Sequence, residues 1–211
     1  MTSTSTFSEI NPSESDIAQL PERQPPILAN ACLQHGVDGE NPVTVIVAQR
    51  ALRQIDDHSH SNLRSALGGA LLGHAYQQNG RLYVQIMAAL PALSEDRSPI
   101  HFKFTADSWA NWHSEREANY PTLDIVGWFH THPDLGVFYS GDDVVVHSAG
   151  FTLPWHVGLV VDPVRSEAAF FGWQRGELIA FNSFYELTEE QGESVVAWHG
   201  VQTAVYQDRS E

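Results

Sequence analysis

Apolar residues gather in short runs between polar stretches, a pattern that predicts strands and helices in alternation. The β-branched run at residues 43–48 (VTVIVA) predicts a buried strand. Residues 66–76 (ALGGALLGHAY) fit a helix or a strand by periodicity alone. Their three glycines and the Gln-Asn-Gly turn at residues 78–80 favour a strand that enters a hairpin. Residues 81–89 are then its partner strand.

Further along, helices are expected at residues 49–57, at 106–118 with Thr105 as N-cap, and from Ser140 to about residue 149. Residues 124–129 (DIVGWF) predict another strand, which the proline at position 133 limits. Three more strands are expected, at residues 155–161, 168–173 and 178–185. This alternation predicts an α/β domain built on a mixed sheet.

The composition changes towards both ends of the chain. Residues 1–25 are rich in Ser, Thr, Glu and Pro and poor in apolar residues, so we expect a disordered N-terminal tail. Residues 26–187 form the expected single domain. Residues 188–211 begin with an acidic stretch and are expected to form a loosely packed acidic C-terminal extension.

The formal net charge is −15, with 11 basic against 26 acidic residues, which argues against a nucleic-acid partner. No apolar run reaches the roughly 18 to 20 residues that a membrane span requires, and the first residues lack the features of a secretory signal. We therefore expect no membrane association and a cytoplasmic protein. The single cysteine, Cys32, excludes an internal disulfide and a multi-thiolate metal site, so metal ligands must be mainly His, Asp or Glu.

The segment of residues 127–143 (GWFHTHPDLGVFYSGDD) carries the clearest chemistry. On a strand, residues i and i+2 face the same side, so His130 and His132 present both imidazoles together. Asp143 can add a carboxylate if the glycine-containing loop folds the chain back. Two imidazoles, one carboxylate and a position left to water form a common catalytic zinc site. Ser140 and Asp143 also read as an ordinary helix start, and both interpretations can hold together.

A second His-x-His pair, His58 and His60, is weaker evidence for a metal site. It lies in a polar stretch with no strand predicted beneath it.

This segment resembles the JAMM motif of the MPN-domain (MPN+, JAB-type) metallopeptidases. The resemblance lies in His130-Thr-His132-Pro, seven intervening residues after His132, and then Ser140-x-x-Asp143. The resemblance implies a cytidine-deaminase-like fold, with a curved mixed β-sheet flanked by helices. It implies one zinc ion (Zn²⁺) per chain, bound by His130, His132 and Asp143, with Ser140 stabilising the oxyanion. It also implies hydrolysis of peptide or isopeptide bonds in a protein or peptide substrate, typically one that carries ubiquitin or a ubiquitin-like protein.

The chain departs from that family at one catalytic position. The family pattern Glu-x-x-Gly-x-x-x-Gly falls on residues 66–73, where Ala66 replaces the glutamate that acts as general base. Such a base is typically worth about 10² to 10⁴ in rate. Three explanations stay open: an engineered inactivation, a natural loss that leaves a binding protein, or a substitute carboxylate such as Asp142, Glu115 or Glu117.

Three functions follow as hypotheses. The first is a zinc-dependent metallopeptidase of the JAMM type, crippled by Ala66. The alternative is a non-catalytic zinc-binding MPN module that binds a ubiquitin-like or other protein partner, and the third is a purely structural domain. Phe138 and Tyr139, just before Ser140, are expected from their position to line a substrate groove or to pack in the core.

Overall fold

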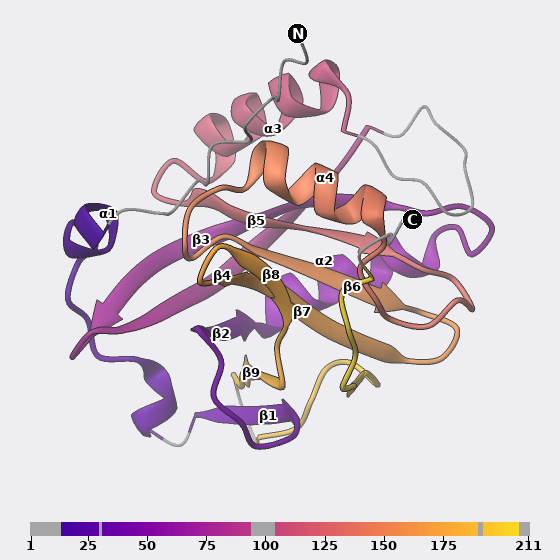
Figure 1. Cartoon of the computed structure of the whole chain (residues 1–211). Helices are drawn as coiled ribbons and strands as arrows, with labels where there is room; N and C mark the ends of the chain where they lie inside the picture. Colours follow the sequence, from indigo (N-terminus) through magenta and orange to yellow (C-terminus); the bar gives the residue numbers. More distant parts are fainter. Residues whose placement is uncertain (1–13, 30, 94–103, 190–191, 207–211) are drawn as a thin grey trace, which may run out of the picture.

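A mixed sheet runs through the computed structural model, which describes residues 14–29, 31–93, 104–189 and 192–206 (Figure 1). The strands of this described part are β1 Cys32–Gly36, β2 Val43–Ala48, β3 Gly68–Gln78, β4 Arg81–Pro91, β5 Asp124–Thr131, β6 Val157–Asp162, β7 Glu167–Gln174, β8 Glu177–Ala180, β9 Ser183–Leu187 and β10 His199–Gly200. Its helices are α1 Glu14–Ala18, the 3₁₀ turn Pro26–Ala29, α2 Gln49–His60, α3 Ala106–Asn119 and α4 Gly141–Gly150.

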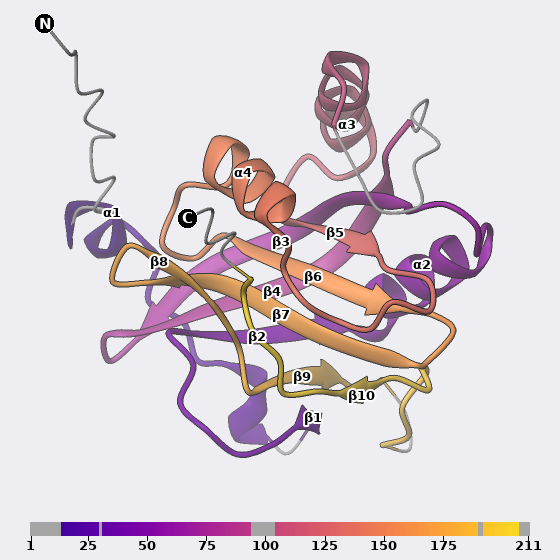
Figure 2. The same cartoon turned by 45° about the vertical axis from the view of Figure 1, so that its right-hand side comes forward.

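The strand order is β1-β9-β2-β4-β3-β5-β6-β7-β10, and β8 pairs with β7 at the side. Parallel pairs (β2 with β4 and β9, β5 with β6, β7 with β10) mix with antiparallel ones. The sheet curls until its two outer strands meet: a Cβ on Gly200 in β10 would overlap the backbone of Gly36 in β1. Figure 2 shows β1, β9 and β10 together at the lower end of the molecule.

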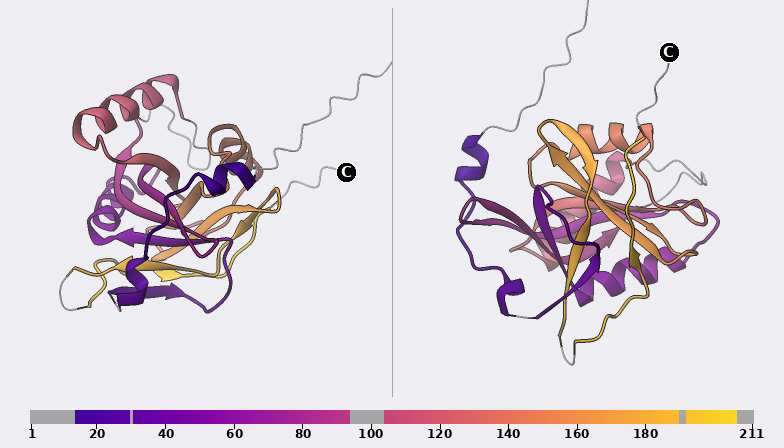
Figure 3. Two further views of the ribbon diagram at one scale, coloured as in Figure 1. Left: turned by 90° about the vertical axis from the view of Figure 1, so that its left-hand side faces the viewer. Right: turned by 60° about the horizontal axis from the view of Figure 1, so that its bottom comes forward.

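Helices cover both faces of this sheet (Figure 3). On one face, Ala51, Leu52 and Ile55 of α2 pack into a core with residues such as Val45 and Phe129. On the other face, a second core contains one buried residue from α3 and aromatic residues near α4: Trp112, Trp128, Tyr139, Phe151 and Phe171. The expected fold class, a curved mixed sheet flanked by helices in one α/β domain, is confirmed.

The structure agrees with the turn, glycine and helix-cap signals of the sequence. Asn79 and Gly80 both have positive φ (50° and 75°) at the tip of the β3–β4 hairpin. Glycine is needed within β3 itself, because a Cβ on Gly73 would overlap the carbonyl oxygen of Gln85 in β4. Thr105 accepts a hydrogen bond from the Ser108 amide and caps α3 as expected. Helix α2 extends three residues beyond the expected end.

The prediction of a single strand at residues 178–185 is wrong. The chain turns at residues 181–182 and forms two strands: β8 pairs with β7, whereas β9 pairs with β1 and β2. The Phe181 amide donates to the Phe170 carbonyl, and the Asn182 amide donates to the Asn41 side chain, which fixes this turn. Strands β1 and β10 were not expected, because each is short and lacks a regular apolar alternation.

The two ends of the chain also differ from expectation. Residues 1–13 of the expected tail lie outside the described residues. Residues 14–25 of that tail include α1 and pair locally with β3, where the Arg23 amide donates to the Gln77 carbonyl. In the C-terminal segment, Val196 and Trp198 are buried in the core beside α2, so residues 192–206 are packed rather than loose.

One buried carboxylate anchors that C-terminal segment. Glu186 of β9 is fully buried and accepts four hydrogen bonds, from the His35 and Gln49 side chains, the Ser194 hydroxyl and the Val195 amide. Burial alone would raise the pKa of Glu186, but these donors hold it below its ordinary value. The segment therefore packs because it satisfies a buried charge, which its composition does not reveal.

None of the helices in the described part of the chain is long and apolar enough to cross a membrane.

Candidate metal centre

Three buried side chains converge at the C-terminal end of β5. His130 lies in β5 and His132 directly after it, and Asp143 lies in the first turn of α4. The Nε2 atoms of the two histidines are 2.9 Å apart, and the Asp143 carboxylate lies 3.1 Å from His130 Nε2 and 3.9 Å from His132 Nε2. Among the described residues, these three form a group whose possible ligand atoms all lie within 4.8 Å of one another.

This arrangement fits a zinc ion. Ligand atoms at usual zinc distances in tetrahedral geometry lie roughly 3.3 Å apart, and the observed separations of 2.9–3.9 Å bracket that value. Burial, together with the neighbouring His130, lowers the pKa of His132 to about 4, so its imidazole is neutral at neutral pH. Two imidazoles and a carboxylate are also donors that zinc accepts readily.

The start of α4 places Asp143. Its Oδ2 accepts hydrogen bonds of 2.7 Å from both the amide and the hydroxyl of Ser140, and Ser140 Oγ accepts from the Asp143 amide. This reciprocal cap leaves Oδ1 directed at His130. Burial alone would raise the pKa of Asp143, but His130 and the Ser140 donors hold it well below its ordinary range. The helix-start and metal-ligand interpretations of Ser140-x-x-Asp143 are therefore compatible.

The same cap bears on the expected role of Ser140. Its hydroxyl proton is directed at Asp143 in this structure. Stabilisation of an oxyanion by Ser140 stays a prediction, and it requires the hydroxyl to turn away from Oδ2.

A buried aspartate, Asp162 at the end of β6, holds the loop that runs from His132 to α4. Its Oδ1 accepts from the Asp134 amide (3.0 Å) and its Oδ2 from the Gly136 amide (2.7 Å). The amides of residues 164 and 165 also donate to Oδ1. The Gly136 carbonyl then lies 3.3 Å from His132 Nδ1, which leaves Nε2 free to face the centre. Sequence reasoning missed this role, because only the parallel pairing of β5 with β6 brings Asp162 beside His132.

Replacing Asp162 with asparagine is expected to weaken zinc binding by about 10- to 100-fold, the range typical for outer-shell partners of metal ligands. The amide group would face backbone N–H donors and release the loop that orients His132. We also expect a loss of about 1–3 kcal/mol in the free energy of unfolding of the metal-free protein. Competition with a zinc chelator and urea unfolding measure the two effects.

Asp134→Asn is the matched control, since the Asp134 side chain is exposed and contacts Arg165 on the surface. It should change zinc affinity less than about twofold. A destabilised Asp162→Asn variant that binds zinc as the unchanged protein does would show that Asp162 does not orient His132.

Ala66 lies beside the cluster. Gly68 is paired with His130 in the antiparallel β3–β5 register, and continuing that register two residues places Ala66 opposite His132. The Leu67 amide donates to Thr131 Oγ1 and the Thr131 amide to the Leu67 carbonyl, which holds the two segments together there. Ala66 is buried in the same core as Trp128 and Tyr139, so its Cβ faces the side of the sheet that carries His130 and His132.

The acids considered as substitutes are not among the converging side chains. Asp142, Glu115 and Glu117 are exposed, and Glu115 contacts Asn119 within α3 while Glu117 contacts Arg116. None of the three belongs to the converging group found among the described residues.

The structure also distinguishes between the other residues considered for a groove or a metal site. Tyr139 is fully buried and stacks on Phe171, with ring centroids 4.0 Å apart, so the groove interpretation of Tyr139 is wrong and the packing interpretation holds. Phe138 is half-buried and packs on His132, with ring centroids 4.7 Å apart, and it stays a candidate for the groove. His58 and His60 lie in the last turn of α2, where residues i and i+2 point in different directions, so they share no site.

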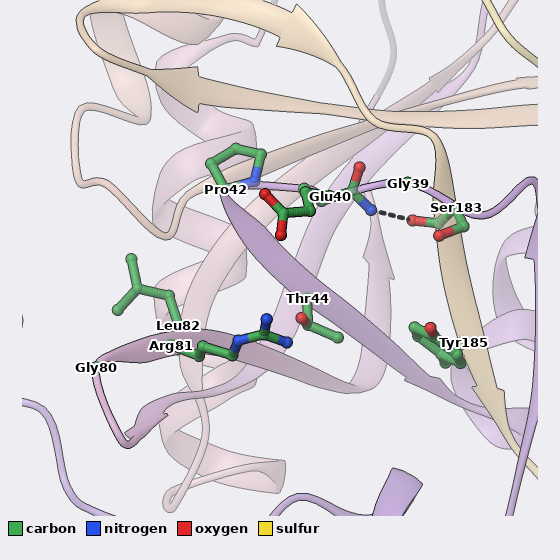
Figure 4. Close-up of a pocket in the computed structure, with 10 residues that line it drawn as sticks. Gly39, Glu40, Pro42, Thr44, Gly80, Arg81, Leu82, Ser183 and Tyr185 are labelled. Atoms are coloured by element: carbon green, nitrogen blue, oxygen red, sulfur yellow. Dashed lines mark hydrogen bonds between the residues drawn. The ribbon is translucent and has the colours of Figure 1, made fainter.

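A surface hollow of about 280 Å³ lies at the opposite end of the sheet, between β2, β4 and β9 (Figure 4). Glu40, Thr44, Arg81 and Tyr185 are among its lining residues. It lies at the N-terminal ends of β2 and β4, whereas the histidine cluster lies at the C-terminal end of β5, which runs in the same direction. The hollow is therefore separate from the candidate metal centre.

Comparison with known proteins gives a consistent result. The sequence model of the family described as JAB1/Mov34/MPN/PAD-1 ubiquitin protease matches residues 40–150, which include His130, His132 and Asp143. NAD(+) hydrolase TcpA of Theionarchaea archaeon (strain DG-70-1) is 30% identical over 125 residues, which is 59% of this chain and 35% of TcpA.

COP9 signalosome complex subunit 5 of Dictyostelium discoideum is 27% identical over 128 residues, 59% of this chain and 37% of that protein. The same subunit of Caenorhabditis elegans is 43% identical over 47 residues, 21% of this chain and 12% of that protein. The match to this chain thus spans only about a third of the length of TcpA. The solution structure of protein DSY2949 from Desulfitobacterium hafniense, 17% identical, has a TM-score of 0.50 and covers 71% of this chain and 96% of its own, which supports the fold alone.

Proposed function

Because the chain belongs to the JAB1/Mov34/MPN/PAD-1 family, we propose that it is a zinc-dependent JAMM-type metallopeptidase scaffold whose activity is crippled by Ala66. Its substrate class is a peptide or isopeptide bond, in a conjugate or precursor of a ubiquitin-like protein. The observation that supports this proposal most is the convergence of His130, His132 and Asp143 at ligand distances.

The roles of the residues follow from their geometry. His130 and His132 would bind the metal through Nε2, and Asp143 through Oδ1, since its Oδ2 is occupied by Ser140. A zinc ion held there would supply Lewis-acid chemistry, acidifying a water molecule and polarising a carbonyl group. The Gly136 carbonyl fixes the tautomer of His132. The Ser140 hydroxyl, once turned from Asp143, would donate to the developing oxyanion.

Among the described residues, the position from which the family's glutamate would act is occupied by Ala66, which is no proton acceptor. The methyl group of Ala66 can neither take a proton from water nor deliver one to the leaving amine. Loss of general acid–base assistance is worth about 10² to 10⁴ in rate. We therefore expect little or no hydrolysis from the chain as it stands.

The second candidate is a non-catalytic zinc-binding MPN module that binds a ubiquitin-like or other protein partner. Ala66 itself favours it. So does the exposure of Asp142, Glu115 and Glu117, none of which belongs to the converging group among the described residues. Both candidate functions require the same bound metal, and they differ only in whether the protein hydrolyses a peptide bond.

Metal analysis tests the part that both candidates share. The full chain, purified without chelator in zinc-containing medium, is expected to carry about one zinc per chain, and His130→Ala far less. Well under one zinc per unchanged chain would refute both candidates and leave a structural domain whose histidines only pack.

A further inference from the structure

The two histidines of the candidate centre are held in different ways. His132 Nδ1 has the Gly136 carbonyl as partner. His130 Nδ1 is buried and has no hydrogen-bond partner among the described residues. Histidines that bind metals almost always donate their second ring N–H to a carboxylate, carbonyl or water, which fixes the ring. Among the described residues, the ring of His130 is therefore oriented on its Nδ1 side by packing.

The orienting group is an aromatic ring. Trp128, two residues earlier on the same face of β5, stacks flat on His130, with ring centroids 4.7 Å apart and planes within 10°. Both side chains are buried. The direction of the His130 imidazole thus depends on where the indole lies.

The indole is in turn held from α4. Trp128 Nε1 donates to His147 Nδ1 at 3.2 Å, and the Tyr139 hydroxyl lies 3.2 Å from the same nitrogen. Since an indole N–H can only donate, His147 Nδ1 must be an unprotonated acceptor. The space for the Tyr139 hydroxyl exists because residue 158 is glycine, where a Cβ would overlap it.

We propose that His147 is a positioning residue for the zinc ligand His130, acting through the hydrogen bond that it accepts from Trp128. This inference rests on the proposed zinc site. His147 lies one helical turn after Asp143, and these two are the buried polar residues of α4. One short helix, fixed by its Ser140 cap, therefore presents the carboxylate ligand and also orients the histidine ligand from behind.

The test uses full-length variants. His147→Phe keeps a ring of similar size but removes the acceptor, and it is expected to weaken zinc binding by about 10- to 100-fold and to change the visible spectrum of the Co²⁺-substituted protein. His147→Asn retains an acceptor near the position of Nδ1 and should recover part of the affinity. His60→Phe is the control, because it makes the same replacement at an exposed position of α2, on the other face of the sheet, and it should leave zinc affinity within about twofold.

A double-mutant cycle tests the route through the indole. Trp128→Phe keeps a ring that can stack but removes the donor, so adding His147→Phe to it should weaken zinc binding no further. The inference is overturned if His147→Phe lowers only the unfolding free energy of the metal-free protein, or if its effect on zinc persists in full without the indole. An unchanged chain that binds no zinc would refute the proposed function itself, and this inference with it.

Discussion

Replacing Ala66 with glutamate is expected to raise the rate of hydrolysis by about 10²- to 10⁴-fold, the usual contribution of a positioned general base. The β3–β5 register places residue 66 opposite His132, and its Cβ lies on the face that carries both histidines. A glutamate there would extend towards the centre, where a carboxylate can accept a proton from water and return it to the leaving amine. The metal ligands are unchanged by this substitution, so the gain should appear without any change in zinc content.

Single-turnover cleavage of a ubiquitin-like conjugate, and of a C-terminally extended precursor, measures the effect. Ala66→Gln is the matched control, because it adds the same length and polarity but no base, and it should stay near the rate of the unchanged chain. His130→Ala added to Ala66→Glu should abolish the gain. Equal rates for the Glu, Gln and unchanged proteins on both substrates would favour the non-catalytic binding module.

The parts of the site that could be predicted from sequence are those set by local geometry. His130 and His132 share a face because a strand repeats every two residues, and Asp143 turns inward because Ser140 caps a helix three residues earlier. The strand at residues 43–48 was equally readable, since a fully buried strand must be almost entirely apolar. Each of these signals lies within a few residues of the feature that it predicts.

Features that depend on distant pairing were not readable. Asp162 acts on His132 only because β6 runs parallel to β5, and Trp198 is buried only because the sheet curls back on itself. Tyr139 illustrates the same limit: its position before Ser140 was compatible with a groove or the core, and the glycine at position 158 decides for the core. Spacing along the chain carries no information on such contacts.

Replacing Asp143 with asparagine is expected to weaken zinc binding by more than about 100-fold, because loss of a direct ligand should exceed the 10- to 100-fold typical of outer-shell partners. Asparagine keeps an oxygen that can accept from Ser140, so the start of α4 should persist, but the anionic ligand is lost. Zinc at 100 times its Kd is expected to stabilise the unchanged protein by about 2.7 kcal/mol. The same zinc concentration should stabilise Asp143→Asn by well under 1 kcal/mol, as measured by urea unfolding with and without the metal.

Asp142→Asn provides the comparison, since it removes the same charge one residue earlier, from an exposed side chain in the same helical turn. Any zinc effect that arises only from the acidic start of α4 would appear equally in both variants. The proposed centre requires the two to differ by two orders of magnitude in zinc affinity. If both variants bind and respond to zinc as the unchanged chain does, the ion is bound at another place, and the convergence of His130, His132 and Asp143 reflects packing and helix capping alone.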